Sequence, residues 1–304
     1  MPGKILITGG SGLIGTRLSE MLIDLGYEVA HLSRKPDKFS RYKTFRWDIK
    51  ENYIDDSAIM YADYIIHLAG ANVGDRKWTD EVKQGIMRSH VEGTNLLYHA
   101  LRRNMHHVKG FVAASAVGIY GNSGDQLMSE ESIYGEDFLA EVCKAKEAAA
   151  WQVKELGLRT VILRLGIVLS LHGGALPQMA RPVKMMAGAP LGSGKQIMSW
   201  IHMDDVCRIF IAAVEDTQFT GVYNAVAPHP VTNSEFTKEL AETMHRPLVL
   251  PRVPAFAINM VFGEKSEVIL GSQRVSANKL LKTGFTFEYS YLSDALDALY
   301  NTKN

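Results

Sequence analysis

The chain has 304 residues, of which 46% are hydrophobic, and its 33 Lys and Arg residues balance 33 Asp and Glu residues. This composition excludes a largely disordered chain, and a zero net charge argues against a nucleic-acid partner or an anionic membrane surface. Two cysteines, Cys143 and Cys207, are too few for a disulfide framework or a four-cysteine zinc site. With no signal peptide and no apolar run of ~20 residues, we expect a cytoplasmic protein that does not enter a membrane.

Short apolar segments alternate with longer segments of helical period through the first half of the chain. The expected strands are 4–8, 28–33, 42–47, 64–68, 108–114 and 160–165, and the expected helices are 13–25, 79–103 and 136–156. This alternation predicts an α/β fold with a doubly wound parallel sheet of the Rossmann type.

Frequent glycines and prolines change this rhythm after about residue 170. Thr232 to Glu235 has the spacing of a capping box, which predicts a helix over 234–244, and an apolar segment follows at 256–262. We therefore expect a dinucleotide-binding domain over 1–170. Residues 171–304 are expected to form a smaller α+β substrate lobe, interleaved with the sheet.

A glycine-rich loop joins the first predicted strand to the first predicted helix. Gly9, Gly12 and Gly15 have G-x-x-G-x-x-G spacing in this strand–loop–helix context. One glycine permits a tight turn, another lets the backbone approach a pyrophosphate, and the third lets helix and strand pack closely. The N–H groups and dipole at the helix start favour phosphate. The loop predicts a dinucleotide cofactor held by Gly9, Ser11, Gly12, Leu13, Ile14 and Gly15.

The end of the second predicted strand indicates which dinucleotide is bound. NAD-specific sites usually carry Asp or Glu there, bonded to the ribose 2′-hydroxyl. This strand ends in Ser33 and Arg34, and no carboxylate occurs before Asp37. Arginine can grip a 2′-phosphate in a bidentate manner, so we expect NADP(H) in preference to NAD(H). Asp48, after the third strand, is either an adenine ligand or an ordinary turn residue.

Further motifs follow in order, and with them the chain resembles an extended short-chain dehydrogenase/reductase. These motifs are Asp48-Ile49, His67-Leu68-Ala69-Gly70, Val91-Glu92-Gly93-Thr94, Ala114-Ser115-Ala116, Tyr120-Gly121, Arg164 and Trp200 to Val206. The segments 115–121, 138–147 and 271–275 resemble more narrowly the atypical "epimerase family" branch, once called nucleoside-diphosphate-sugar epimerase-like, which has its own C-terminal domain. The resemblance implies further cofactor contacts from Ile49, Leu68, Ala69, Gly70 and Arg164.

The catalytic pair of such reductases is missing. In the resembled enzymes a Tyr and a Lys four residues later move a proton and hold the nicotinamide ribose. Counting back from Glu147 places Leu139 and Cys143 at these positions, and the helix contains no Tyr-x-x-x-Lys in any alignment. Ser115, Tyr120 and Cys143 are the leading substitutes, with Glu141 and His202 as further candidates.

Each candidate also has an ordinary structural interpretation. Tyr120 can be a packing residue with a satisfied hydroxyl, and Cys143 a small buried residue. We expect His202 and Asp204 to stabilise a loop and His67 to be a core histidine. The histidines lack metal-ligand neighbours in the sequence, so no metal site is expected.

Two basic segments suggest a small, anionic substrate. The first is Asn72 to Trp78, followed by Lys83 and Arg88, and the second is the glycine–lysine loop Gly192 to Lys195. With Arg164 they can receive a carboxylate or diphosphate, although solvated surface charges explain them equally well. Four methionines, Met179, Met185, Met186 and Met198, line either a pocket or a core; we favour the core. A homodimer is compatible with the sequence.

Two functions compete. The first is an NADP(H)-dependent oxidoreductase or epimerase-like enzyme, an atypical short-chain dehydrogenase/reductase. The alternative is a non-catalytic NADP(H)-binding regulatory or sensor protein, which keeps the glycine loop but needs no acid–base pair.

Overall fold

A computed structural model describes residues 3–37, 39–74 and 77–301 of the chain. Contacts group the chain into two units, each built from three separate stretches. Unit 1 consists of Met1–Ser115, Glu141–Leu163 and Cys207–Tyr223, and unit 2 of Ala116–Ala140, Arg164–Val206 and Asn224–Asn304. The predicted division into domains near residue 170 stays a prediction.

An eight-stranded sheet has the order β12-β8-β6-β5-β1-β2-β3-β4. Its strands are β1 (Lys4–Thr8), β2 (Glu28–Ser33), β3 (Lys43–Asp48), β4 (Tyr53–Ile54), β5 (Tyr64–His67), β6 (Gly110–Ala116), β8 (Arg159–Leu165) and β12 (Gly221–Ala225). β1 pairs in parallel with β2 and β5, as do β2 with β3 and β5 with β6, whereas β4 runs antiparallel to β3. The sheet is mostly parallel and flanked by helices, so the predicted Rossmann-type fold class is confirmed.

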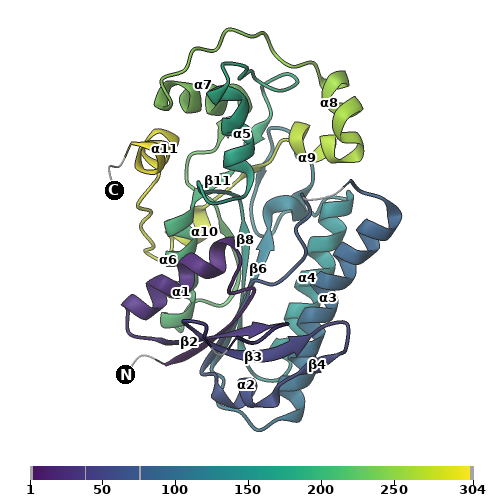
Figure 1. The fold of residues 1–304 in the computed structure, drawn as a ribbon, viewed down its shortest axis with the longest axis vertical. Helices are drawn as coiled ribbons and strands as arrows, with labels where there is room; N and C mark the ends of the chain where they lie inside the picture. The colour runs from purple at the N-terminus through teal and green to yellow at the C-terminus, as the bar shows by residue number, and fades with distance from the viewer. Residues whose placement is uncertain (1–2, 38, 75–76, 302–304) are drawn as a thin grey trace. The chain divides into compact units, whose positions relative to one another are not determined.

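The helices of unit 1 cover both faces of its strands. α1 (Leu13–Asp24) lies on one face, and α3 (Asp80–Arg103) and α4 (Phe138–Lys154) lie on the other (Figure 1). Buried side chains from β1, β2, β3, β5, β6, α2 (Asp56–Tyr61), α3 and α4 form a single core cluster, with Leu6, Ile65, Leu97 and Val153 inaccessible to solvent. Burial of this apolar surface is the main source of stability, and it orients α4 against the sheet.

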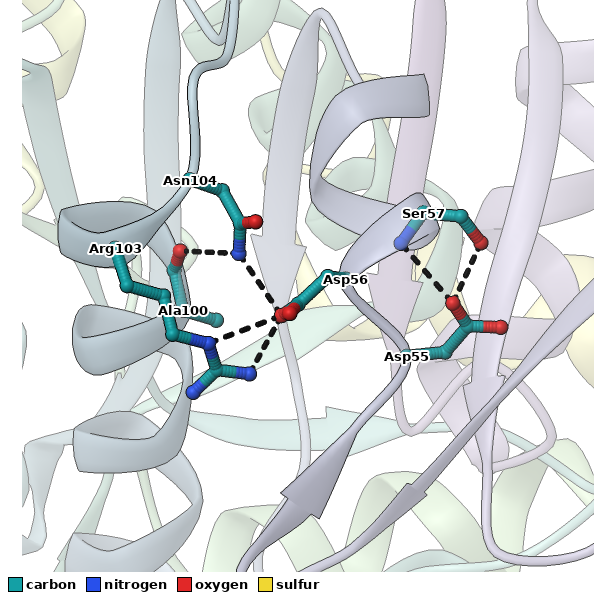
Figure 2. Close-up of polar contacts among 6 residues, drawn as sticks. All are labelled: Asp55, Asp56, Ser57, Ala100, Arg103 and Asn104. Carbon is teal, nitrogen blue, oxygen red and sulfur yellow. Dashed lines mark hydrogen bonds and ion pairs between the residues drawn. The ribbon is translucent and has the colours of Figure 1, made fainter.

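The end of α3 is fastened to the start of α2 by polar contacts (Figure 2). Asp55 caps α2 by accepting from the Ser57 N–H at 3.0 Å. Asp56 accepts from Arg103 Nε at 3.1 Å and from Asn104 at 2.8 Å. Because α3 follows β5 and returns to the start of β6, these contacts lie at the amino edge of the sheet.

Unit 2 has its own core and three two-stranded sheets. The pairs are β9 (Ile167–Leu169) with β11 (Trp200–His202), β10 (Ile197–Met198) with β13 (Val231–Thr232), and β7 (Leu127–Met128) with β14 (Arg274–Val275). Its helices include α5 (Ala175–Lys184), α7 (Asn233–Thr243), α8 (Ala255–Phe262), α9 (Ser266–Leu270), α10 (Asn278–Leu281) and α11 (Leu292–Tyr300), and α6 (Met203–Glu215) leads back into unit 1. Trp200, Phe236 and Leu296 are buried in its core cluster. The predicted capping box is confirmed, since Thr232 and Glu235 cap α7 reciprocally.

The predicted elements agree closely with the observed ones. Strands 4–8 and 28–33 match β1 and β2, and the predicted helix 79–103 begins one residue later, with Thr79 as its N-cap. The fifth strand spans 110–116 instead of 108–114, and α4 is shorter at both ends than predicted. Of the four methionines, Met179 and Met198 pack against the core of unit 2, whereas Met185 and Met186 are exposed, so the core interpretation is wrong for these two.

Candidate functional site

The glycine loop, Thr8–Gly15, leaves no room for side chains at three positions. Gly9 has a φ of +69°, which side chains rarely tolerate, and its carbonyl accepts from the Gly12 N–H at 2.9 Å. A Cβ on Gly15 would lie 2.3 Å from the same carbonyl oxygen, and a Cβ on Gly10 would lie 2.4 Å from the His31 ring. The loop is therefore closely packed against its own backbone and against β2.

The start of α1 has no side-chain cap. Gly12 is the N-cap residue, no described side chain bonds to the first turn, and the first turn holds no acidic residue. Ser11 and Gly12 are exposed, and Leu13 and Ile14 are half-buried. The uncapped N–H groups and the positive end of the helix dipole form an anion site. A pyrophosphate suits this place, because the helix start is uncapped and the neighbouring Ser11 and Gly12 are exposed.

His31 packs beneath the glycine loop, against Gly10. Its Nε2 lies 2.8 Å from the Ser19 hydroxyl, which donates to the Gly15 carbonyl at 2.6 Å. Tyr42 stacks on the other side of the ring, with centroids 4.5 Å apart. Burial lowers the pKa of His31 to about 4, so the ring is neutral at physiological pH.

His67 joins the carboxyl ends of β1 and β5. Its Nδ1 lies 2.7 Å from the Thr8 hydroxyl, which also accepts from the Ala69 N–H at 3.1 Å. Its Nε2 lies 3.0 Å from the Thr94 hydroxyl, which donates to the His90 carbonyl. Burial lowers the pKa of His67 well below its ordinary range. The histidine is therefore neutral and structural, as predicted, and it fixes the loop over Leu68, Ala69 and Gly70 beside the glycine loop.

The loop after β2 presents Arg34 to solvent. Ser33 and Lys35 form a small turn, in which the Ser33 hydroxyl accepts from the Lys35 N–H at 3.2 Å. Arg34 is exposed, and it forms no hydrogen bond or ion pair within the described ranges. Asp37, the nearest carboxylate in sequence, accepts from the Phe39 N–H at 2.8 Å. An arginine that is unpaired among the described residues thus lies where an NAD site would have the carboxylate that binds the ribose.

The remaining predicted cofactor residues of unit 1 fall in two loops. Asp48 accepts from the Lys50 N–H at 2.9 Å and so forms a turn, its role as an adenine ligand stays a prediction, and Ile49 packs against the core. Gly9 and Ala69 approach closely, since a Cβ on Gly9 would lie 3.1 Å from the Ala69 nitrogen. A Cβ on Gly70 would overlap the His90 ring at 2.1 Å. The loop after β5 is thus packed between the glycine loop and α3.

A buried polar cluster faces the end of β6; we call it the α4 cluster, and it comprises Ser115, Cys143, Lys146 and Glu147. The Ser115 hydroxyl donates to Glu147 Oε1 at 2.6 Å. All four residues are at most 8% exposed. Cys143, Lys146 and Glu147 have i, i+3 and i+4 spacing, so they share one face of the helix. The structure therefore places two predicted candidates, Ser115 and Cys143, beside two charged residues.

Lys146 was missed as a candidate by the sequence analysis. Burial lowers its pKa to about 8, while the neighbouring Cys143 and Glu147 act in the opposite direction. The signal was present as two charged residues in an alanine-rich helix, on the face shared with Cys143. The search for a Tyr-x-x-x-Lys spacing does not test that face.

Tyr120 and Arg164 lie together in unit 2. The Tyr120 hydroxyl donates to Asn224 at 2.7 Å and accepts from Arg164 at 2.9 Å. Arg164 is fully buried and also donates to the Tyr134 hydroxyl at 3.1 Å and to the Glu130 carbonyl. Burial raises the pKa of Tyr120, and Arg164 and Asn224 oppose that shift. The phenol proton is therefore already engaged; the catalytic role of Tyr120 and the cofactor role of Arg164 stay predictions.

Other predicted residues are less organised. Asp75 and Arg76, in the first basic segment, lie outside the described residues, and Lys77, Arg88 and Lys195 are exposed. The imidazole of His202 accepts from the Asp204 N–H at 3.1 Å, consistent with a loop-stabilising pair. Within the described part of the chain there is no group of three or more metal-ligating side chains and no helix able to span a membrane.

Comparison with known proteins defines the class. The NAD dependent epimerase/dehydratase family matches residues 5–225, and a domain of unknown function, DUF1731, matches residues 253–299. The chain belongs to this epimerase family, as the sequence resemblance predicted.

Individual relatives agree over the full length. The epimerase family protein YfhF of Bacillus subtilis is 35% identical over 97% of each chain. The crystal structure of human epimerase family protein SDR39U1, isoform 2, with NADPH has a TM-score of 0.88 at 30% identity, covering 99% of this chain and 100% of that one. UDP-glucuronic acid 4-epimerase from Bacillus cereus, solved with UDP-glucuronic acid and NAD, has a TM-score of 0.78 at 19% identity, which shows a shared fold.

Proposed function

We propose that this protein binds NADP(H) at the glycine loop and uses it in an oxidoreductase or epimerase-like reaction on a small substrate. The observation that carries the cofactor assignment is Arg34, which directly follows β2, is exposed and has no hydrogen bond or ion pair among the described residues. The human relative solved with NADPH supports it, because its chain is matched over its whole length. A bound nicotinamide supplies or accepts a hydride.

Different residues of unit 1 would bind different parts of the cofactor. Backbone N–H groups of Leu13 and Ile14 at the uncapped start of α1 receive the pyrophosphate. Arg34 would hold the 2′-phosphate, and Ser33, whose hydroxyl donates to the Lys35 carbonyl at 3.0 Å, would lie beside it. The loop over Leu68 to Gly70, fixed by His67 and Thr8 at the end of β5, would lie beside the bound cofactor.

A titration of NADPH and NADH tests this assignment by fluorescence. We expect the wild type to prefer NADPH by at least about tenfold, and Arg34→Asp to remove that preference, because a charged hydrogen bond contributes ~1.5–3 kcal/mol. Arg102→Asp is the matched control: it makes the same charge change near the end of α3, at the amino edge of the sheet. A preference for NADH, or an equal loss in both variants, would contradict the proposal.

A non-catalytic NADP(H)-binding regulatory protein is the second candidate, and Leu139 and Cys143 favour it because they occupy the positions of the usual acid–base pair. Absorbance of NADPH with a panel of small aldehydes, ketones and keto acids separates the two. The enzyme consumes NADPH with some member of the panel, and the anionic keto acids are the members we expect to react. A regulatory protein consumes it with none.

A further inference from the structure

Lys146 is an unusual cation because its side chain is largely buried, yet its amine makes no hydrogen bond or ion pair with any residue that the structure describes. The residue is 7% exposed. A buried charge is normally paired, since removing it from water is costly. Arg159 of the same unit shows the ordinary arrangement, with its guanidinium donating to the carbonyls of Ala213, Val214 and Phe219.

The surroundings of Lys146 place it at the ligand-binding edge of the sheet. It interacts electrostatically with His67 at the end of β5, with His90 on α3, and with Cys143 and Glu147 on its own helix. Thr8, His67 and Ala113 are in register across β1, β5 and β6, so these strands end at one edge. Ligands of open α/β sheets bind at this carboxyl edge.

A second polar group nearby also lacks a partner. His90 Nδ1 is buried and has no hydrogen bond within the described ranges, although Nε2 of the same ring lies 3.2 Å from the Ala71 carbonyl. Burial and the charge of Lys146 lower the pKa of His90 to about 4, so the imidazole is neutral. The Lys146 amine and His90 Nδ1 thus both lie at this edge without a hydrogen bond to a described residue, and both could bind a polar ligand.

We infer that Lys146 is the proton-transfer group of this protein's reaction with a carbonyl substrate, in place of the missing Tyr–Lys pair. The inference rests on the proposed function. As a hydride from a reduced nicotinamide reaches the carbonyl carbon, the C=O π pair moves onto oxygen. The new O–H bond forms as one N–H bond of the Lys146 ammonium breaks, and the neutral amine then takes a proton from water. The reverse steps serve oxidation of an alcohol.

The chemistry of this amine suits the task. A proton donor works best when its pKa lies near the working pH, and burial moves Lys146 toward that range. Glu147 is held by the Ser115 hydroxyl, and Cys143 lies one turn before it, so the electrostatic partners of the amine are fixed in position. The proton donor is thus preorganised on a helix instead of a loop.

Competitive acetylation of the intact wild-type protein tests the inference without a known substrate. Trace acetic anhydride is applied across a pH series, with and without saturating NADPH, and labelling at each lysine is quantified by mass spectrometry. Lys144, on the same helix and paired with Glu141, is the matched control. We expect a labelling midpoint near pH 8 for Lys146. NADPH should reduce its labelling by about tenfold or more and leave Lys144 unchanged.

Each other outcome overturns the inference. Absence of labelling at Lys146 while Lys144 reacts would show that the amine is closed to small molecules. A midpoint near its ordinary value of 10.5 would show that it is a poor donor at neutral pH. The reduction of Lys146 labelling by NADPH is compared with an NADPH fluorescence titration of the same sample. If NADPH does not bind, the proposed function itself is wrong. If NADPH binds but does not reduce the labelling, only the role of Lys146 is wrong.

Discussion

The glycine loop and the α4 cluster lie at the same edge of one sheet, but they are built in opposite ways. The loop excludes side chains, so that its groups for binding are backbone N–H groups fixed by close contacts between Gly9, Gly12 and Gly15. The α4 cluster buries ionisable side chains, and its Lys146 makes no hydrogen bond or ion pair within the described part of the chain. The first region is stable because it is tightly packed; the second retains a group that opposes stability.

The largest expected effect is at the packed region. Gly15→Ala places a Cβ 2.3 Å from the Gly9 carbonyl and 2.6 Å from Gly10 Cα, and neither backbone atom can rotate away. We expect a loss of at least about 3 kcal/mol in the free energy of unfolding, with NADPH binding abolished. Thermal unfolding by circular dichroism and an NADPH titration measure both quantities. Binding equal to that of the wild type would show that the loop has more freedom than its contacts indicate.

The second prediction concerns the buried cation and has the opposite sign. Lys146→Met keeps an unbranched side chain, shorter by one atom, and removes the desolvation penalty of the charge, so it should stabilise the protein at pH 7 on the order of 1–3 kcal/mol. The folded-state pKa of about 8 lies below the ordinary value of 10.5. Between these values the unfolded chain holds a proton that the folded chain lacks, so wild-type stability rises with pH.

The gain in the free energy of unfolding of Lys146→Met over the wild type should therefore be complete below pH 8 and disappear toward pH 10.5. Urea unfolding at a series of pH values measures this difference, and Lys144→Met serves as the half-buried, ion-paired control on the same helix. If Lys146→Met instead destabilises the protein at pH 7, Lys146 stabilises the fold. The α4 cluster would then not differ from the glycine loop in this respect.

The smallest effect comes from a glycine with no such constraint. Gly85 lies inside α3, and a Cβ there would meet nothing within 4 Å. Gly85→Ala should stabilise the protein by ~0.5–1 kcal/mol through reduced backbone entropy of the unfolded chain, without changing NADPH affinity. The same two measurements apply. If Gly85→Ala destabilises the protein, a loss of stability in Gly15→Ala could no longer be assigned to the close packing of the glycine loop.

The sequence predicted the backbone-built region better than the side-chain-built one. The spacing of Gly9, Gly12 and Gly15 located the loop, because the need for glycine there depends on neighbouring backbone. The apolar segments placed β1 and β2 at their observed bounds. The contact of Gly10 with His31 was not predictable, since it joins the loop after β1 to a buried ring on β2. The α4 cluster depends on the rotation of a helix and on the burial of Lys146 and Glu147, which a linear motif does not encode.

Unit 1 closes only when its last stretch, Cys207–Tyr223, joins the first 115 residues. In a chain made from the amino end, that stretch leaves the ribosome long after the glycine loop. Arg159 can meet its carbonyl acceptors on Ala213, Val214 and Phe219 only at that late stage. The nucleotide-binding unit should therefore acquire protease resistance only after the stretch up to Tyr223 has been synthesised, and not when its first 115 residues are complete.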